Sequence, residues 1–327
     1  MRCYKIVVGG KTLFELNGKN PIAPRIRFDI RTYRDQDALA VLEIYNLDFK
    51  YFVGNKSLIE KELELHAWIA QTPMTRNIGY TNESSNTLIY RGKILNLVPN
   101  YNLGESTCLT ILLGTAPKIE KKAEKKVFLN FKKDIFILNE ITSALKKLYP
   151  DMIISSSASK AKTLRQFLVK ANMQTEVKDI NDIQKVLDTI KLNNTKEHIQ
   201  IYNDGKNRLI IGTNVLSESD VTLPNYSIRV YDLLEQPQYI QNEAIQLSLR
   251  ISGKYKILDT FLIPNNIAFN ISSISSSVYN QNYDYSQKVF FSGLFQINKV
   301  WHVGDTHNIQ AQQWATNIEA TPLHNNT

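Results

Sequence analysis

The sequence predicts a mainly β protein with an α+β insert, and three observations lead to this fold class. Short alternating runs of apolar and polar residues fill the first and last thirds of the 327 residues. Between them, apolar residues recur every three or four positions, as on one face of a helix. The final stretch, 293–318, alternates twice around a break at Gly304-Asp305, a pattern typical of the terminal hairpin that closes a β-barrel.

The first third is expected to contain strands. Two short strands joined at Gly9-Gly10 open the chain, and turns rich in Gly, Asn and Pro separate the later ones. The alternating segments are 26–30, 40–47, 63–69, 87–94 and 108–114. Strands of this length and spacing predict a barrel or a sandwich. The segment 57–63 fits either a short helical turn or the lead-in to a strand.

The middle third changes to helical spacing. The segments with apolar residues on one helical face are 137–148, 163–171 and 182–190. Pro150 is expected to end the first helix, and Asn181 or Asp182 to cap the third. A hairpin follows over 198–212, with its turn at Asp204-Gly205. This order of elements predicts a small α+β domain.

The last third returns to strands, which are expected at 226–231, 244–251 and 255–258, before the terminal hairpin. Ser, Asn and Tyr dominate 270–286, so this segment is expected to be a long exposed loop. The predicted domains are a first β-barrel at 1–117, a basic linker at 118–136, an α+β domain at 137–215 and a second β-barrel at 216–327. The two β regions could be distant versions of one barrel.

Composition limits the classes of protein to consider. An apolar content of 43% is enough for real cores, which argues against wholesale disorder. No run of about 18 apolar residues predicts a membrane span, and the N-terminus does not resemble a signal peptide, so assembly in the cytosol is expected. Cys3 and Cys108 are expected to remain reduced and to pack as small hydrophobic residues.

The net charge of +8 raises the question of nucleic-acid binding. Much of the excess lies in one segment, at Lys118, Lys121, Lys122, Lys125, Lys126, Lys132 and Lys133. A solvated linker or helix face is the favoured interpretation. A patch that faces phosphate groups is the alternative, because clustered lysines bind DNA without any further motif.

Motifs for chemistry are weak. The pairs Ser157/Lys160 and Ser159/Lys162 have the Ser-x-x-Lys spacing of some acylating enzymes, but the companion motifs are missing. Tyr and Phe residues lie on alternating strands and form no basic aromatic stripe, so packing is favoured over a base-stacking platform. We predict no enzyme activity, no catalytic residues and no cofactor.

The terminal hairpin contains the one group of possible metal ligands. His302, Asp305 and His307 could together hold a metal ion, but Gly304-Asp305 is also what a tight turn requires. We favour a turn with polar side chains and predict no metal site. Trp301 and Trp314, one on each strand, are expected to pack in the barrel or at an interface.

Several phrases, in order along both ends of the chain, resemble the baseplate hub proteins of contractile-tail phages, which are related to the hub portion of type VI secretion spike proteins. In the first β region they are Ile26-x-Phe28-x-Ile30, Val41-x-x-Ile44-Tyr45-Asn46-Leu47 and Leu88-Ile-Tyr-Arg-Gly92-Lys-Ile94. In the last they are Val230-x-Asp232-Leu233-Leu234-x-x-Pro237, Ile245-x-Leu247, Phe295-x-Ile297-x-x-Val300-x-His302-x-Gly304-Asp305 and Trp314-x-Thr316.

The resemblance implies a virion protein whose two tail-tube-like barrels alternate around a homotrimer to form a pseudo-sixfold ring. Such a ring adapts the sixfold tail tube above to the threefold spike below, contacts wedge proteins and leaves a channel through which DNA passes. The segment Lys118 to Lys133 is then expected to face outward or to meet an acidic neighbour. The alternatives are a wedge or tube-initiator protein, a basic nucleic-acid-binding protein, and a peptidoglycan hydrolase of the tail.

Overall fold

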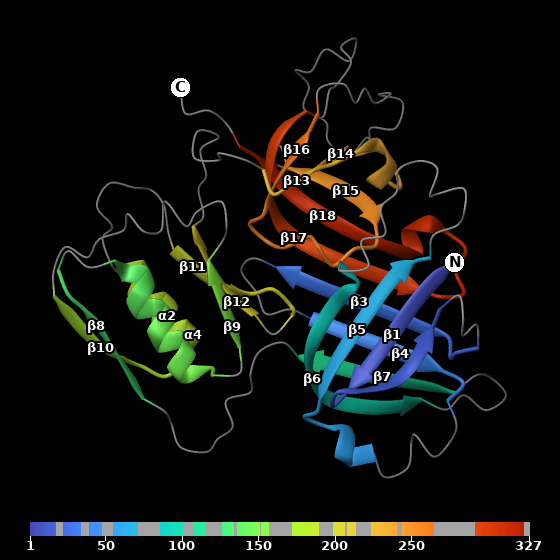
Figure 1. Cartoon of the computed structure of the whole chain (residues 1–327), viewed down its shortest axis with the longest axis horizontal. Helices are drawn as coiled ribbons and strands as arrows, with labels where there is room; N and C mark the ends of the chain where they lie inside the picture. The colour runs from blue at the N-terminus through green and yellow to red at the C-terminus, as the bar shows by residue number, and fades with distance from the viewer. Residues whose placement is uncertain are drawn as a thin grey trace.

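A computed structural model describes residues 1–17, 22–33, 39–47, 55–70, 86–100, 107–114, 126–133, 136–150, 152–156, 172–189, 199–206, 208–213, 224–240, 244–264 and 292–323. The chain is mainly β, and its elements form three parts (Figure 1). We call them the first β unit (β1 to β7), the α+β unit (β8 to β12 with helices α2 and α4) and the last β unit (β13 to β18).

The strands of the first β unit are β1 (Arg2–Val8), β2 (Lys11–Leu16), β3 (Ile26–Tyr33), β4 (Leu39–Tyr45), β5 (Glu62–Ile69), β6 (Leu88–Asn100) and β7 (Cys108–Gly114). The strands of the last β unit are β13 (Tyr226–Ser227), β14 (Gln238–Tyr239), β15 (Ile245–Arg250), β16 (Thr260–Ile263), β17 (Gly293–Asp305) and β18 (Trp314–Pro322). Short 3-10 helices are η2 (Asn55–Leu58), η6 (Val230–Asp232) and η8 (Ala311–Gln313).

The α+β unit contains β8 (Val127–Phe131), α2 (Ile137–Leu148), β9 (Ile153–Ser156), β10 (Met173–Val177), α4 (Ile180–Thr189), β11 (Ile199–Asn203) and β12 (Arg208–Thr213). The pair β8–β10 and the sheet β11–β12–β9 flank the two helices (Figure 1). The apolar face of α2 packs into the core between them through Ile137, Ile141 and Leu145. In the described part of the chain, no helix has the length and apolar character needed to cross a membrane.

The two β units share one sheet of 13 strands. Its main path runs β14-β15-β18-β17-β3-β4-β7-β6-β5-β1-β2, with β16 and β13 attached beside β17. The terminal hairpin, expected to close a barrel, therefore also joins the last β unit to the first through the pair β17–β3. Closure of either unit into a barrel stays a prediction.

The same strand order occurs in both β units. In the first unit, five consecutive strands lie in the order β3-β4-β7-β6-β5, and in the last unit five consecutive strands lie in the order β14-β15-β18-β17-β16. Every pair within each set is antiparallel. The units differ at their ends, because β1 and β2 form an antiparallel hairpin whereas β13 runs parallel to β16.

Three large apolar clusters fill the interior of the described part of the chain. One lies in the first β unit, one in the α+β unit and one in the last β unit. The boundaries are shared in two places. Trp314 of the last unit lies in the first cluster, and Tyr202 and Ile210 of the α+β unit lie in the third. The three parts are consequently packed together rather than linked loosely.

Most of the predicted elements that fall on described residues are present, including the Gly9-Gly10 turn and the Asp204-Gly205 hairpin. The alternatives for 57–63 are resolved, because η2 precedes a strand that begins at Glu62. The predicted helix 163–171 and the loop 270–286 lie outside the described residues. Part of the segment predicted as a basic linker is a strand, β8, which pairs with β10.

Four local predictions about the later part of the chain were wrong. Strand β13 ends at Ser227 instead of 231, and 255–258 is a turn in which Leu258 has a φ of 62°. The cap of α4 comes from Asp179, whose Oδ1 accepts the Asp182 N–H at 2.8 Å, rather than from Asn181 or Asp182. The terminal hairpin turns at 306–313 and not at Gly304-Asp305, because β17 keeps pairing through Asp305.

Candidate functional site

The candidate site is the seam, by which we mean the β3–β17 pairing and the loop 306–313 beside it. Its register runs from Lys299 opposite Tyr33 to Asp305 opposite Arg27. The seam is the place where the two β units become one sheet. Any function that depends on how the two units are arranged therefore depends on this pairing.

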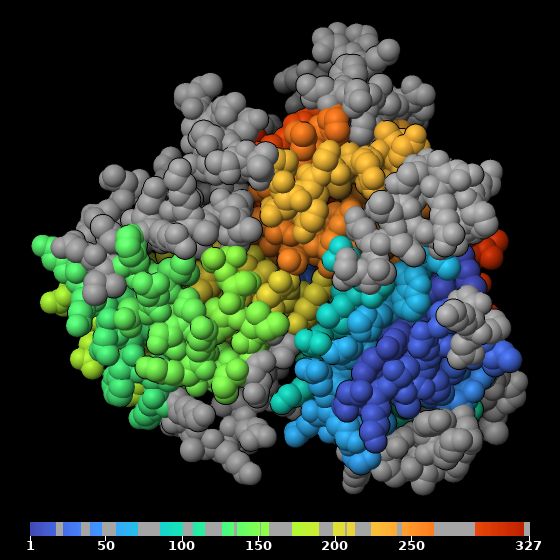
Figure 2. Space-filling view, viewed as in Figure 1, coloured from blue at the N-terminus to red at the C-terminus, as the bar shows by residue number. Residues whose placement is uncertain are grey.

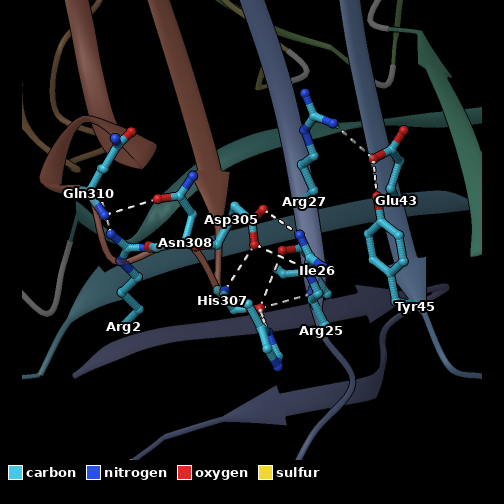
Figure 3. A network of polar contacts seen from close by, with 11 residues as sticks. Arg2, Arg25, Ile26, Arg27, Glu43, Tyr45, Asp305, His307, Asn308 and Gln310 are labelled. Carbon is cyan, nitrogen blue, oxygen red and sulfur yellow. Dashed lines mark hydrogen bonds and ion pairs between the residues drawn. The ribbon is translucent and has the colours of Figure 1, made fainter. Parts of the chain in front are cut away.

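Asp305 ends β17 and binds Arg25, which precedes β3 (Figure 3). Arg25 donates to the carboxylate through Nη2 at 2.7 Å and Nε at 3.2 Å, and the backbone N–H of His307 donates at 2.9 Å. Burial favours the neutral acid, but the hydrogen bonds from Arg25 and His307 outweigh it, so the pKa of Asp305 is lowered. The charged form of Asp305 thus fastens the loop to the first β unit.

Arg2 of β1 holds the same loop from the other side (Figure 3). Its guanidinium donates to the backbone carbonyls of Asp305, Asn308 and Gln310. The Arg2 guanidinium also lies 5.9 Å from the ring centroid of Trp314. One arginine therefore satisfies several carbonyl groups that the end of β17 leaves without strand partners.

Aromatic packing joins the seam to the core of the first β unit. Trp314 is 1% exposed, and its indole N–H donates to the Trp68 carbonyl at 3.1 Å. The rings of Phe28 and Trp314 meet edge to face at 5.3 Å. A Cβ at Gly304 would lie 2.2 Å from the Phe28 ring, so only glycine lets this ring lie across β17.

The solvent-facing side of the seam is a row of alternating charges and aromatic rings. Trp301 donates to Asp29 at 2.9 Å, and the Arg31 guanidinium lies 4.7 Å from the Trp301 ring. Lys299 binds Glu319 at 2.6 Å. These pairs cross from β3 to β17 to β18, as cross-strand pairs that stabilise a sheet do. Trp301 and Trp314 thus both take part in packing at the seam, as predicted.

The tip of the β11–β12 hairpin lies against the junction of the two β units, seen in yellow between the orange and cyan parts in Figure 2. The Gly205 carbonyl accepts the Arg91 N–H of β6 at 2.9 Å, and the Lys206 ammonium donates to the Gly253 carbonyl. Asp204 is 6% exposed and is paired with Arg208. An Asp-Gly turn is normally at the surface, whereas this one is buried between β6 and the segment that contains Gly253. We therefore call the tip of the hairpin a wedge between the two β units.

His302 is buried on the inner side of β17. Its Nδ1 lies 3.0 Å from the Thr316 hydroxyl. Burial lowers the pKa of His302 to about 3, and the nearby charge of Lys206 acts in the same direction. The side chain is therefore neutral at physiological pH.

The possible metal ligands do not form a common site. His302 faces Thr316, Asp305 is engaged by Arg25, and His307 is exposed. Over the described ranges, no cluster of three or more His, Cys, Asp or Glu side chains could hold a metal ion.

Some residues singled out from the sequence fall outside the described part of the chain. The pairs Ser157/Lys160 and Ser159/Lys162, and the lysines from Lys118 to Lys125, lie outside the described residues. Lys132 and Lys133 are exposed, and Lys126 binds Glu176 at 3.1 Å. Cys3 is buried, Cys108 is half-buried, and both are free thiols.

Sequence reasoning missed the arginines and the lysine that hold the junction. Arg2, Arg25 and Lys206 belong to no recognisable motif. Their partners are backbone carbonyls or a carboxylate far along the chain, such as Asp305, which lies 280 residues from Arg25. No local pattern could have identified them.

The fold resembles those of tail proteins and of a secretion component, although no protein-family model and no curated protein matches the sequence. The 43 kDa tail protein of prophage MuSo2 from Shewanella oneidensis has a TM-score of 0.51 and 7% identity, with 98% of each chain covered. The tail protein from Neisseria meningitidis MC58 has a TM-score of 0.50 and 9% identity, with 98% of this chain and 95% of that chain covered.

A third structure is the E. coli c3393 protein, a component of the type VI secretion system described as similar to the T4 bacteriophage tail proteins gp27 and gp5. It has a TM-score of 0.50 and 6% identity, and the match covers 97% of this chain and 76% of that chain. At such low identities the likeness concerns the fold. The resemblance to tail hub proteins seen in the sequence is thus confirmed at the level of the fold, which this chain shares with phage tail proteins and a type VI secretion component.

Proposed function

We propose that this protein is a structural component of a phage tail baseplate, a trimeric hub that adapts the sixfold tail tube to the threefold central spike. The repeated strand order is the observation that supports this most directly. A chain with two alike β units can present six similar units when three copies form a ring. The fold shared with phage tail proteins supports the same role.

The partners in this proposal are two further copies of the chain, a tail tube or tube-initiator protein above, a spike protein below and wedge proteins at the periphery. DNA passes through the channel without being held, and the protein catalyses no reaction. The proposed domains are those given by the sequence, 1–117, 137–215 and 216–327, except that β8 of the segment 118–136 is assigned to the α+β domain, because it pairs with β10. The lysines of that segment face outward, assembly occurs in the host cytoplasm, and the mature protein resides in the virion.

Sedimentation equilibrium of the purified chain, alone and with its spike, tests the trimer. One chain has a mass of 37.5 kDa, so three copies give about 112 kDa. Electron-microscope images of the particles should show a ring with six similar lobes and a central channel. A species that stays monomeric or dimeric at every soluble concentration and with the spike added would contradict the proposal. So would a ring whose bore is lined by Lys118 to Lys133.

A further inference from the structure

Strands β6 and β17 hold the same place in the two β units. Each is 13 residues long, and each pairs along one edge with the strand that follows it in the chain. Each has a register shift in that pairing, between Ile94 and Asn96 in β6 and between Ile297 and Lys299 in β17. The shifts allow the two strands to be aligned residue by residue.

Strands β6 and β17 differ along their other edge, the one that faces away from β7 or β18. The difference begins after the register shift, towards the C-terminal end of each strand. There, β17 receives β3 along 299–305. The corresponding residues of β6, 96–100, have no strand on that edge among the described residues, because the pairing with β5 ends at Lys93. The Leu97 N–H donates to the side-chain oxygen of its neighbour Asn96 at 2.9 Å. The C-terminal part of β6 therefore has one edge without a neighbouring strand among the described residues.

The exposure of the aligned side chains also indicates that β6 lacks a neighbouring strand on this edge. Val300 and His302 are 3% and 2% exposed, and their counterparts in β6 are Leu97, which is half-buried, and Pro99, which is exposed. Val98 lies on the other face and is 37% exposed, and its counterpart Trp301 on the solvent-facing side of the seam is half-buried. Apolar residues at these positions lack the cover that the seam gives to β17.

The strand that corresponds to β3 in the last β unit is β14. Both strands pair with the next strand of the chain, and among the described residues β14 is the last strand at its end of the sheet. Strands β6 and β14 belong to different units of one chain, with the seam between them in the sheet (Figure 1). A contact between them that repeats the seam consequently joins two copies.

Resting on the trimer proposed above, we propose that residues 98–100 of β6 receive the segment Gln238–Ile240 of a second copy, which contains β14, in an antiparallel pairing that repeats part of the β3–β17 seam. The register follows from the alignment. Asn100 corresponds to Val303, and Gln238 corresponds to Asp29, which faces Val303 across the seam. Asn100 of one copy then lies opposite Gln238 of the next.

The chemistry of the open edge fits a partner that is specific and not any extended strand. Pro99 has no N–H, and Asn96 occupies the N–H of Leu97, so the edge offers few free donors. Proline and reduced donor sets are devices that limit indiscriminate strand pairing. In this register Tyr239 of the second copy lies opposite Pro99 and Ile240 lies opposite Val98, so the pairing covers apolar side chains in addition to forming hydrogen bonds with backbone groups of the edge.

Disulfide trapping tests the register. In the full chain carrying Cys3→Ala and Cys108→Ala, we would introduce Asn100→Cys together with Gln238→Cys and oxidise the purified protein. We expect covalent species of two and three chains on non-reducing gels and none larger, because three copies close the ring. Val303→Cys with Asp29→Cys is the matched control and should form its bond within one chain. Asn100→Cys with Thr12→Cys, placed on the strand at the opposite end of the sheet, should not cross-link.

The mass of each variant separates this proposal from the function on which it rests. Val98→Asp should shift the equilibrium from trimer towards monomer, whereas Ile153→Asp, at an exposed apolar residue of the α+β unit, should leave the trimer unchanged. If a trimer forms but the Asn100–Gln238 cross-link does not, or if Val98→Asp does not weaken the trimer, the proposed pairing is wrong. The proposal that the protein is a hub is unaffected by either result. A chain that never trimerises, alone or with the spike, overturns both.

Discussion

Single residues at the seam contribute through their size as well as through their charge. Gly304 leaves room for the Phe28 ring, and His302 is a neutral polar side chain in a buried position. Asp305, three residues further on, stays charged because Arg25 and backbone N–H groups bind it. Residues close together in β17 therefore have opposite electrostatic environments, because a strand places neighbouring side chains on opposite faces.

Gly304→Ala is expected to destabilise the protein by about 1–3 kcal/mol, because the added methyl group overlaps the Phe28 ring. Urea unfolding followed by tryptophan fluorescence measures this. Phe28→Leu in the same chain should recover part of the loss, so the two changes should be less than additive. Strict additivity would show that the steric explanation is wrong.

The contribution of His302 to the free energy of unfolding is expected to decrease as the pH is lowered. Its folded pKa, about 3, lies below the unfolded value of about 6.5, so the unfolded chain binds the proton more readily. The contribution is complete above pH 6.5 and is lost as the pH falls towards 3, by several kcal/mol at about 1.4 kcal/mol per pKa unit. His302→Asn should flatten the profile of unfolding free energy in this window. A profile of unfolding free energy that His302→Asn leaves unchanged would contradict this explanation.

At the scale of elements, the β11–β12 hairpin is the wedge that connects the α+β unit to both β units. Its strands belong to the sheet β11–β12–β9, while Tyr202 and Ile210 reach the core of the last β unit. Its turn meets β6 through Arg91 and the loop before β16 through Gly253. The hairpin thus couples parts that have cores of their own.

Gly205→Ala is expected to cost more stability than Gly10→Ala. Both glycines have nearly the same left-handed backbone, with φ of 77° and 78°, so each substitution carries a strain of about 1–2 kcal/mol. A Cβ at Gly10 meets nothing within 4 Å, whereas one at Gly205 lies 3.1 Å from the Thr32 hydroxyl. Hydrogen exchange at the Arg91 amide should accelerate in Gly205→Ala and not in Gly10→Ala. Equal exchange in both variants would contradict a wedge at this position.

At the scale of the whole molecule, the β units share a sheet but the α+β unit has its own sheets and core. Cooperative unfolding is expected to follow this division, because a shared strand such as β17 transmits the loss of one β unit to the other. The fold shared with tail proteins and the repeated strand order are properties of this scale alone.

Ile141→Ala is expected to destabilise the α+β unit selectively. The fully buried Ile141 side chain is removed from the core of α2, at a cost of about 2–5 kcal/mol. Trp68, Trp301 and Trp314 all lie in the β units, so the fluorescence transition should move little while the far-ultraviolet helical signal is lost earlier. Ile30→Ala, in the first β unit, should shift the fluorescence transition instead. A common shift of both signals in Ile141→Ala would show that the molecule unfolds as one unit.

The local elements can be predicted from the order of residues along the chain. The helical face at 137–148, the turn at Asp204-Gly205 and the alternation of the strands each arise from neighbours in the chain, and each is present. These patterns reveal which side of an element is apolar. They also sufficed for the resemblance to tail hub proteins, because the phrases that support it are short and local.

The way in which these elements combine is seen only in the folded chain. Arg25 and Asp305 are 280 residues apart, and no periodicity records that their strands are neighbours. The burial of the Asp204-Gly205 turn likewise depends on surfaces supplied by distant segments. Side-chain periodicity indicates that a face is buried, but it does not indicate which segment buries it. Strand order, the seam and the repeat of the two β units therefore become visible only in the folded chain.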